Sequence, residues 1–169
     1  MAAHTRISDS EFMVEKLSVP VSIESAIQNP FTLSLAVSQA NLGSTIAHVS
    51  NVEYLRWIDC ISDLHGISCG QSRQQLLAQE RMWFVSRHEI DYLAEAFAGD
   101  RLGCATWFSR FGRTTLQRET LIWNRDRHVA VCRASSRWVF MDLKSRKPTR
   151  IDDSQVQSFQ LLALRSAQG

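Results

Sequence analysis

The spacing of the apolar residues changes twice along the chain, and each change marks a different element. Residues 31 to 39 (FTLSLAVSQ) alternate, and their apolar face is formed by Phe31, Leu33, Leu35 and Val37. This alternation predicts a half-buried strand. A polar loop at residues 41 to 45 (NLGST) follows, and from Val52 to about Gly66 the apolar positions recur at helical spacing. This region therefore predicts a strand, a loop and one long helix.

The second half of the chain returns to the period of a strand. Residues 70 to 81 are polar and fit either a helix or a loose segment. Four strands are predicted after them, at residues 82 to 93, 103 to 111, 114 to 124 and 128 to 142, with turns at 111 to 113 and 124 to 127. The first of these strands has an apolar face formed by Met82, Phe84, Ile90 and Tyr92. The last has one formed by Ala130, Cys132, Ala134, Trp138 and Phe140.

These elements predict one domain of the α+β class. A helix with one apolar stripe and a sheet with one apolar face each need a partner, so the helix should lie across the sheet. The dipeptide Asn29-Pro30 marks the start of the domain, which we place at residues 30 to 150. Residues 1 to 29 are expected to form an extension with one short helix, and residues 151 to 169 a tail that adds another.

Composition narrows the class of protein. The chain has 169 residues, of which 44% are hydrophobic and 21% charged, which suits one soluble domain. The net charge of +2 is too small to indicate a nucleic-acid surface. Four widely separated cysteines indicate reduced thiols and a cytoplasmic protein. Neither a targeting peptide nor a membrane span is predicted.

The start of the predicted helix is the strongest candidate for chemistry. The first N–H groups of a helix have no partner, and the helix dipole favours an oxyanion at that end. In STIAHVSNVEYLRWID, residues 44 to 59, these are the amides near His48 to Asn51. A metal site is not predicted, because no short ligand spacing joins His48, His65, His88 and His128. No cofactor is predicted either.

Four segments together resemble a known family. They are HVSNVEYLRWID at the helix start, HEIDYLAEAFAGDRL, SRFGRTTL and WVFMDLKSRKP. Their order is similar to that of the hotdog-fold thioesterases, and among these to the 4-hydroxybenzoyl-CoA thioesterase-like group. The resemblance covers about residues 30 to 150. It implies the hotdog fold, an antiparallel five-stranded sheet wrapped around one long central helix, and the hydrolysis of an acyl thioester of CoA or acyl-carrier protein.

The resemblance also implies site residues. Counting back from Tyr54 without a gap, the family's Gly falls on Ala47, its His on His48 and an Asn on Asn51. The family's catalytic acid falls on Ser44, which departs from the pattern because serine is neutral at pH 7 and needs an adjacent base.

A gapped alternative matches Asn41 and Leu42 to the acid-lacking hotdog thioesterases of enediyne polyketide pathways, in which an asparagine and backbone amides orient substrate and water. It requires a loop three residues longer here. The candidate catalytic residues are therefore Asn41, Ser44, His48 and Asn51.

Several of these residues also fit structural roles. His48 fits a hydrogen bond to the loop backbone, and Ser44 fits a helix cap. Glu53 fits either a carboxylate that complements the helix dipole or one that faces the substrate. The arginines near the hairpin suit either of two roles, binding the phosphates of CoA or keeping an exposed strand surface in solution. The candidate substrate-binding residues are Ala47, Glu53, Arg87, Arg110 and Arg113.

The expected activity is hydrolysis of an acyl thioester, with the carbonyl polarised by amides at the helix N-terminus. The alternative is a non-catalytic acyl-thioester-binding hotdog protein that has lost the acid, and turnover distinguishes the two. A hotdog dehydratase is a weaker third reading. An exposed sheet edge is usually paired or blocked, and hotdog proteins resemble one another in joining two such edges. We therefore expect a homodimer or a dimer of dimers (a homotetramer), with sites shared between chains.

Overall fold

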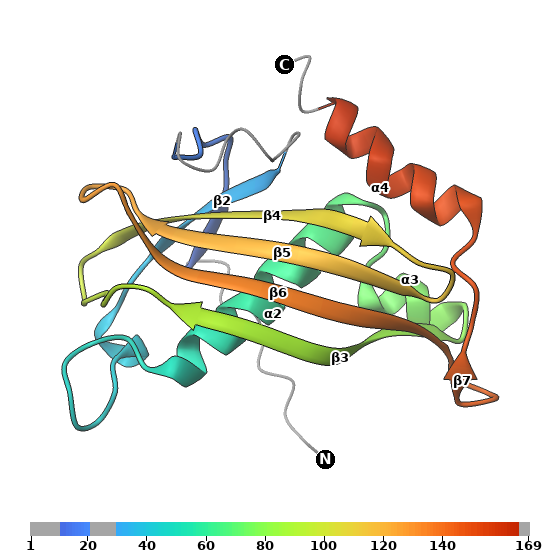
Figure 1. Ribbon diagram of the computed structural model, residues 1–169, viewed down its shortest axis with the longest axis horizontal. Helices are drawn as coiled ribbons and strands as arrows, with labels where there is room; N and C mark the ends of the chain where they lie inside the picture. The colour runs from blue at the N-terminus through green and yellow to red at the C-terminus, as the bar shows by residue number, and fades with distance from the viewer. Residues whose placement is uncertain (1–10, 21–29, 166–169) are drawn as a thin grey trace.

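The protein folds as one curved antiparallel sheet that wraps around a long helix, α2 (Figure 1). The computed structural model describes residues 11–20 and 30–165. The elements are β1 (Phe12–Val14), β2 (Phe31–Ala36), η1 (Gln39–Asn41), α2 (Asn51–Ser68), α3 (Arg73–Ala78), β3 (Arg81–Tyr92), β4 (Arg101–Phe111), β5 (Thr115–Asn124), β6 (Val129–Asp142), β7 (Lys147–Pro148) and α4 (Asp153–Arg165). The strand order is β1-β2-β4-β5-β6-β3, with β7 paired to β6.

The architecture predicted from the sequence is confirmed, with two additions. All five predicted strands are present as β2 to β6, and α2 crosses them as expected. Within residues 11–20 and 30–165 the sheet has seven strands rather than five, because β1 pairs with β2 and β7 pairs with β6. Residues 70 to 81 contain the short helix α3, and the tail contains α4. Within the predicted extension, residues 12–14 form a strand, whereas residues 1–10 and 21–29 lie outside the described residues.

The core lies between α2 and the inner face of the sheet. The buried stripe of α2 consists of Tyr54, Trp57, Ile58, Ile61, Ser62 and His65. Trp57 is fully buried, and it clusters with Leu33 of β2 and Cys104 of β4. The helix runs past Gly66 to Ser68, and Gly70 at φ 68° provides the left-handed residue that ends it.

A bulge in β3 changes which of its residues face the core. The pairing with β6 passes from Val85 directly to Arg87, so Ser86 is an extra residue. Before the bulge the odd-numbered Trp83 and Val85 pack inward, and after it the even-numbered residues do, as Ile90 shows. The prediction that Phe84 shares the apolar face of Ile90 is therefore wrong, because one extra residue inverts the alternation.

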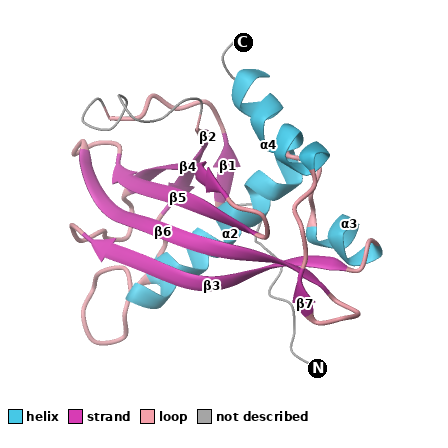
Figure 2. Ribbon diagram, turned by 45° about the vertical axis from the view of Figure 1, so that its right-hand side comes forward, coloured by secondary structure: helices cyan, strands magenta, loops and turns pink. Residues whose placement is uncertain are grey.

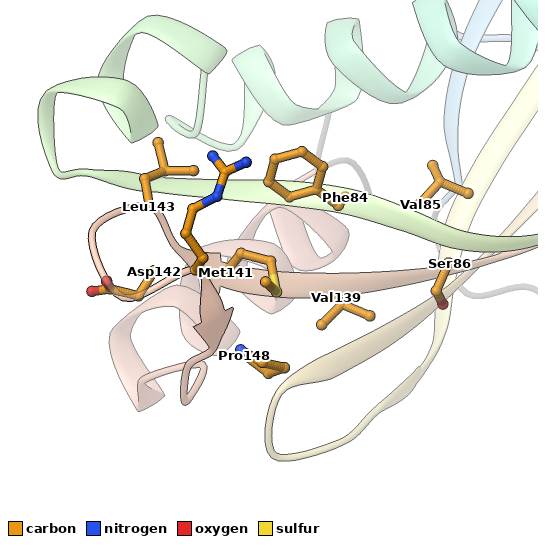
Figure 3. A pocket seen from close by; sticks show the side chains of 9 residues that line it. Phe84, Val85, Ser86, Val139, Met141, Asp142, Leu143 and Pro148 are labelled. Atoms are coloured by element: carbon orange, nitrogen blue, oxygen red, sulfur yellow. The ribbon is translucent and has the colours of Figure 1, made fainter.

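Phe84 instead lies on the outer face of the sheet. Its side chain is 48% exposed. With Val139, Met141 and Pro148 it lines a shallow groove of about 500 Å³ beside β7 (Figure 3).

A second bulge, in β6, places Ala130 on the opposite face of the sheet from the one predicted. The β5–β6 pairing passes from Ile122–Cys132 to Trp123–Ala130, so Val131 has no partner on β5, and it is fully buried. Ala130 consequently packs with Trp123 in the outer cluster beneath residues 17 to 19, not with the inner face.

Helix α4 covers the end of the inner face that α2 leaves open (Figures 1 and 2). Phe159 packs against Phe108 of β4, with the ring centroids 4.5 Å apart, and clusters with Trp138 of β6. Among the described residues, no helix is long and apolar enough to cross a membrane.

Candidate active site

The N-terminus of α2 presents two free backbone donors. Ser50 is the N-cap, and its hydroxyl oxygen and carbonyl oxygen accept hydrogen bonds from Glu53 N at 3.4 and 3.0 Å. Ser50, not Ser44, thus has the capping role. Within the described residues, the N–H groups of Asn51 and Val52 have no acceptor, and both residues are exposed. Together with the helix dipole they can polarise a carbonyl oxygen.

The loop before α2 is closed at its base and exposed at its tip. Leu42 and Val49 form an isolated antiparallel bridge, and Gly43 N donates to His48 O at 2.8 Å. Ser44 and Ala47 lie on the exposed part of this loop. The Ser44 hydroxyl has no hydrogen-bond partner in the described part of the chain, so the structure places no base beside it.

His48 is held by a carboxylate. Its Nδ1 lies 3.1 Å from Oε1 of Glu95, with Nδ1–H as the donor in the neutral ring. The imidazole side chain is 32% exposed and the carboxylate 63% exposed. This contact leaves Nε2 as the available base, and the carboxylate stabilises the imidazolium that forms when Nε2 takes a proton.

The segment that carries Glu95 is anchored beside the start of α2. Val49 N donates to Ala96 O at 2.8 Å, and Arg127 donates to Glu95 O at 2.7 Å. Sequence reasoning did not single out Glu95, because 47 positions separate it from His48 and no motif joins the two.

Asn41 is buried and belongs to a polar clamp, which we define as Glu11, Ser38, Asn41, Glu53, Arg56 and Trp57. The Asn41 amide donates to Glu11 at 3.0 Å and to Glu53 at 2.9 Å. Its Oδ1 accepts from Ser38 N and Oγ at 2.7 and 2.9 Å. With every polar atom of its side chain engaged, Asn41 positions the start of α2, and the geometry does not favour direct contact with substrate.

Arg56 joins the two carboxylates of the clamp. Its guanidinium donates to Glu53 at 2.8 Å and to Glu11 at 2.5 Å, and Trp57 Nε1 donates to the same Glu11 oxygen at 3.0 Å. Burial by itself would raise the pKa of Glu11, but the hydrogen bonds from Arg56 and Trp57 outweigh it and lower that pKa. Glu53 is thus occupied by the clamp, as a carboxylate in the first helical turn.

The candidate arginines do not converge on the α2 N-terminus of their own chain. Arg87 is exposed on β3 and pairs with Glu89. Arg110 and Arg113 are exposed beyond Phe108, which stacks at 4.8 Å on His65 in the last turn of α2. Fifteen residues of helix, about 22 Å, separate that turn from Ser50.

The structure therefore gathers Asn41, His48, Asn51 and Glu53 around the start of α2 and adds Glu95 to them. Among the described residues, no group of three or more His, Cys, Asp or Glu side chains could hold a metal ion. The four cysteines are unpaired, and burial raises the pKa of the Cys104 thiol, which makes it a poor nucleophile.

A curved antiparallel sheet around one long helix, whose N-terminus bears the candidate site, defines the hotdog class. Two solved structures support this fold. A 1,4-dihydroxy-2-naphthoyl-CoA thioesterase from Synechocystis, Slr0204, has a TM-score of 0.71 at 18% identity, over 78% of this chain and 96% of that one. The 12:0-ACP thioesterase from Umbellularia californica has a TM-score of 0.67 at 18% identity, over 79% of this chain and 53% of that one.

Residues 39–159 match the family described as acyl-ACP thioesterase N-terminal domain, and the chain belongs to this family. It is also 28% identical over 79 residues to acyl-[acyl-carrier-protein] hydrolase FATB2, chloroplastic, of Cuphea viscosissima. That match covers 47% of this chain and 19% of the relative, so the chain spans a small part of the relative's length. Membership in the 4-hydroxybenzoyl-CoA thioesterase-like group stays a prediction.

Proposed function

We propose that this protein hydrolyses acyl thioesters to a free acid and a thiol. Its family membership supports the reaction, and the observation that carries the site is the His48–Glu95 pair next to the free N–H groups of Asn51 and Val52. A histidine base and an oxyanion site are two of the parts that acyl transfer to water requires.

In the proposed reaction, a water molecule is the nucleophile. His48 Nε2 takes a proton from the water as its oxygen attacks the thioester carbonyl, and the amides of Asn51 and Val52 stabilise the oxyanion. The C–S bond then breaks, and the leaving sulfur takes the proton from His48 and departs as the free thiol. Glu95 keeps the ring oriented throughout. Ser44 has no step here, because no described residue lies at hydrogen-bond distance to activate its hydroxyl.

The acyl group is proposed to arrive on acyl-carrier protein or CoA. The family description and the Cuphea relative support the carrier protein. Coenzyme A is supported by the likeness to SAV2348 of Staphylococcus aureus, solved in complex with CoA (TM-score 0.75, 12% identity, 89% of each chain). We propose a cytoplasmic location, consistent with four free cysteines.

We propose a homodimer that forms through β3, with a dimer of dimers as the larger alternative. Among the described strands β3 is an edge of the sheet (Figure 2), and the outer side of its 12 residues offers a row of backbone groups that no described strand pairs. Large apolar side chains are exposed near the β3 end and the α2 start, namely Val52, Leu55, Tyr92, Leu93 and Phe97. A partner chain would cover them and complete the site.

The proposal is tested by thiol release from a panel of acyl-CoA and acyl-carrier-protein thioesters with short, long, branched and aromatic acyl groups. Saturable turnover on any of them is expected. The absence of a carboxylate from residues 42 to 50 favours a second candidate, an acyl-thioester-binding protein without activity. Saturable binding of intact thioesters with no thiol release across the panel would replace the first candidate with the second.

A further inference from the structure

A buried layer of polar side chains interrupts the core between α2 and the sheet. On one side lies the cluster around Trp57, and on the other the cluster of Leu116, Trp138 and Phe159. Between them lies the inner polar layer, which we define as His65, His88, Thr106, Arg118, Thr120 and Ser136. All but His88 are buried. The proposed reaction uses none of these residues, and a polar layer inside a core calls for an explanation.

Arg118 is a buried cation that has no anionic partner among the residues that the structure describes. Its side chain is 5% exposed. Nη1 donates to His65 Nδ1 at 2.7 Å and to Thr106 Oγ1 at 3.2 Å, and the guanidinium carbon lies 4.4 Å from the centre of the Phe108 ring. Nε is buried and has no hydrogen-bond partner in the described part of the chain. The buried Nε–H is therefore left over for an acceptor.

The groups around Arg118 do not neutralise it. Burial lowers the pKa of Arg118 to about 10, so the guanidinium remains charged at neutral pH. Burial and the Arg118 charge lower the pKa of His65 well below its usual value, so its ring is neutral and accepts the hydrogen bond. Asp63, the carboxylate whose charge reaches Arg118, is bound to Arg73 at 2.8 Å. A buried charge without a counter-charge raises the free energy of the folded protein, and a bound anion offsets that destabilisation.

His88 extends the layer as far as the edge strand β3. This residue lies on the edge strand β3, is half-buried, and has Nδ1 2.8 Å from Ser136 Oγ. Ser136 and Arg118 are directly opposite each other on β6 and β5. The hydroxyl of Ser136 therefore lies between the imidazole of His88 and the strand position of Arg118.

We propose that the inner polar layer binds a carboxylate carried on an apolar chain, with Arg118 as its principal donor. The proposal rests on the proposed function, because that reaction releases such an acid. A planar guanidinium matches a carboxylate, and the clusters on either side suit hydrocarbon. The carboxylate comes either from the free acid product or from the far end of an acyl substrate, since about 22 Å of helix separates His65 from the α2 start.

Binding is measured first, without turnover. Isothermal titration of the full chain with a long-chain free acid and with the alcohol of the same length should show the acid binding at least about tenfold more tightly. Arg118→Met should abolish the difference. If the layer only fastens α2 to the sheet, Arg118→Met will lower the melting temperature and leave discrimination between acid and alcohol unchanged, which overturns the proposal. Equal binding of acid and alcohol to the wild-type protein also overturns it.

Kinetics then separate the two sources of the carboxylate. Arg118-dependent inhibition by the free acid identifies the product, whereas an Arg118-dependent preference for acyl-CoA with a distal carboxylate over the unsubstituted chain identifies the substrate.

Should Arg118→Met fail to fold, Arg118→Lys retains the charge but loses Nε, and it should weaken acid binding more than alcohol binding; equal weakening contradicts the proposal. Arg118-dependent binding by a protein that releases no thiol would reject the proposed hydrolysis while leaving this site in place.

Discussion

His48 is a residue whose role depends on a neighbour far away in the sequence. By itself, an exposed histidine before a helix fits a loop hydrogen bond, and the contact with Glu95 at 3.1 Å is what suits it to act as a base. Asn41 shows the converse. Its side chain accepts two hydrogen bonds from Ser38 and donates one each to Glu11 and Glu53, so a candidate substrate contact is instead a positioning residue.

Replacing the base should remove most of the activity. His48→Gln is expected to lower kcat by roughly 10²–10⁴-fold with little change in melting temperature, because general-base catalysis contributes a factor of that size. Thr45→Ala, on the exposed part of the same loop, is the matched control and should retain wild-type kcat. Wild-type turnover by the His48 variant would remove the histidine from the mechanism.

Replacing Glu95 should have a smaller effect. Glu95→Gln is expected to lower kcat up to about fivefold, because an exposed ion pair is worth about 1 kcal/mol or less. Glu89→Gln, another exposed carboxylate, serves as the comparison in the same steady-state assay. A loss as large as that of His48→Gln would show that the carboxylate does more than orient the ring.

Gly103 is required by packing on the outer face. A Cβ added there would lie 2.3 Å from the indole of Trp123. Gly103→Ala should therefore destabilise the protein by about 1–3 kcal/mol, the usual cost of overpacking, as measured by denaturant unfolding. The double variant Gly103→Ala with Trp123→Leu should recover part of the loss relative to the sum of the single changes; strict additivity would argue against this contact as the cause.

At the scale of elements, two bulges determine which strand side chains face the core, and the clamp determines what holds the start of α2. The bulge at Ser86 sends Phe84 outward, and the one at Val131 sends Ala130 outward, although both strands follow their predicted ranges. The clamp ties the segment before β1 to the first turns of α2, so Glu11 supports the candidate site from outside the predicted domain boundary.

The clamp predicts a loss of stability in acid. The pKa of Glu11 lies below its usual value of 4.5 in the folded protein, so its contribution is fully present above pH 4.5 and is lost as the pH falls below that value. Glu11→Gln should cost about 1–3 kcal/mol at pH 7 and should flatten the fall of melting temperature between pH 5 and pH 3. Glu89→Gln is the control, and an equally steep fall in both variants would exclude Glu11 as the source.

At the scale of the whole molecule, the uncovered features gather at one edge. The edge strand β3, the exposed apolar side chains near the α2 start and the free amides of that helix lie close together, which fits a site completed by a second copy. The candidate arginines Arg87, Arg110 and Arg113 are exposed, and Arg110 and Arg113 lie away from the α2 N-terminus of the same chain. A role for these arginines toward CoA phosphates thus depends on the second copy.

The dimer can be tested by the mass of the particle in solution. Light scattering coupled to size-exclusion chromatography should give twice the mass of one chain, or four times for the dimer of dimers. Leu55→Glu with Leu93→Glu should shift it to the monomer and reduce activity, because charges would replace apolar side chains in the interface. Leu77→Glu, an equally exposed leucine on α3, should leave the mass unchanged. A wild-type monomer would contradict the proposed assembly.

The sequence by itself determined the strands β2 to β6, the long helix and the α+β class, in which the helix lies across the sheet. Alternation in residues 31 to 39 and 82 to 142, and the helical stripe that begins at Val52, depend on neighbours a few positions apart, and each element must bury its own apolar face. The start of α2 could be located as a candidate site for the same reason, because its free amides belong to the helix itself.

Only the tertiary structure decided which side chains meet. Glu95 lies beside His48 across 47 positions, and His65 accepts from Arg118 across 53 positions. The two bulges and the occupied amide of Asn41 likewise follow from pairing with distant strands and segments. No local period encodes such contacts, since they arise only when the sheet curves around α2 and brings separate parts of the chain together.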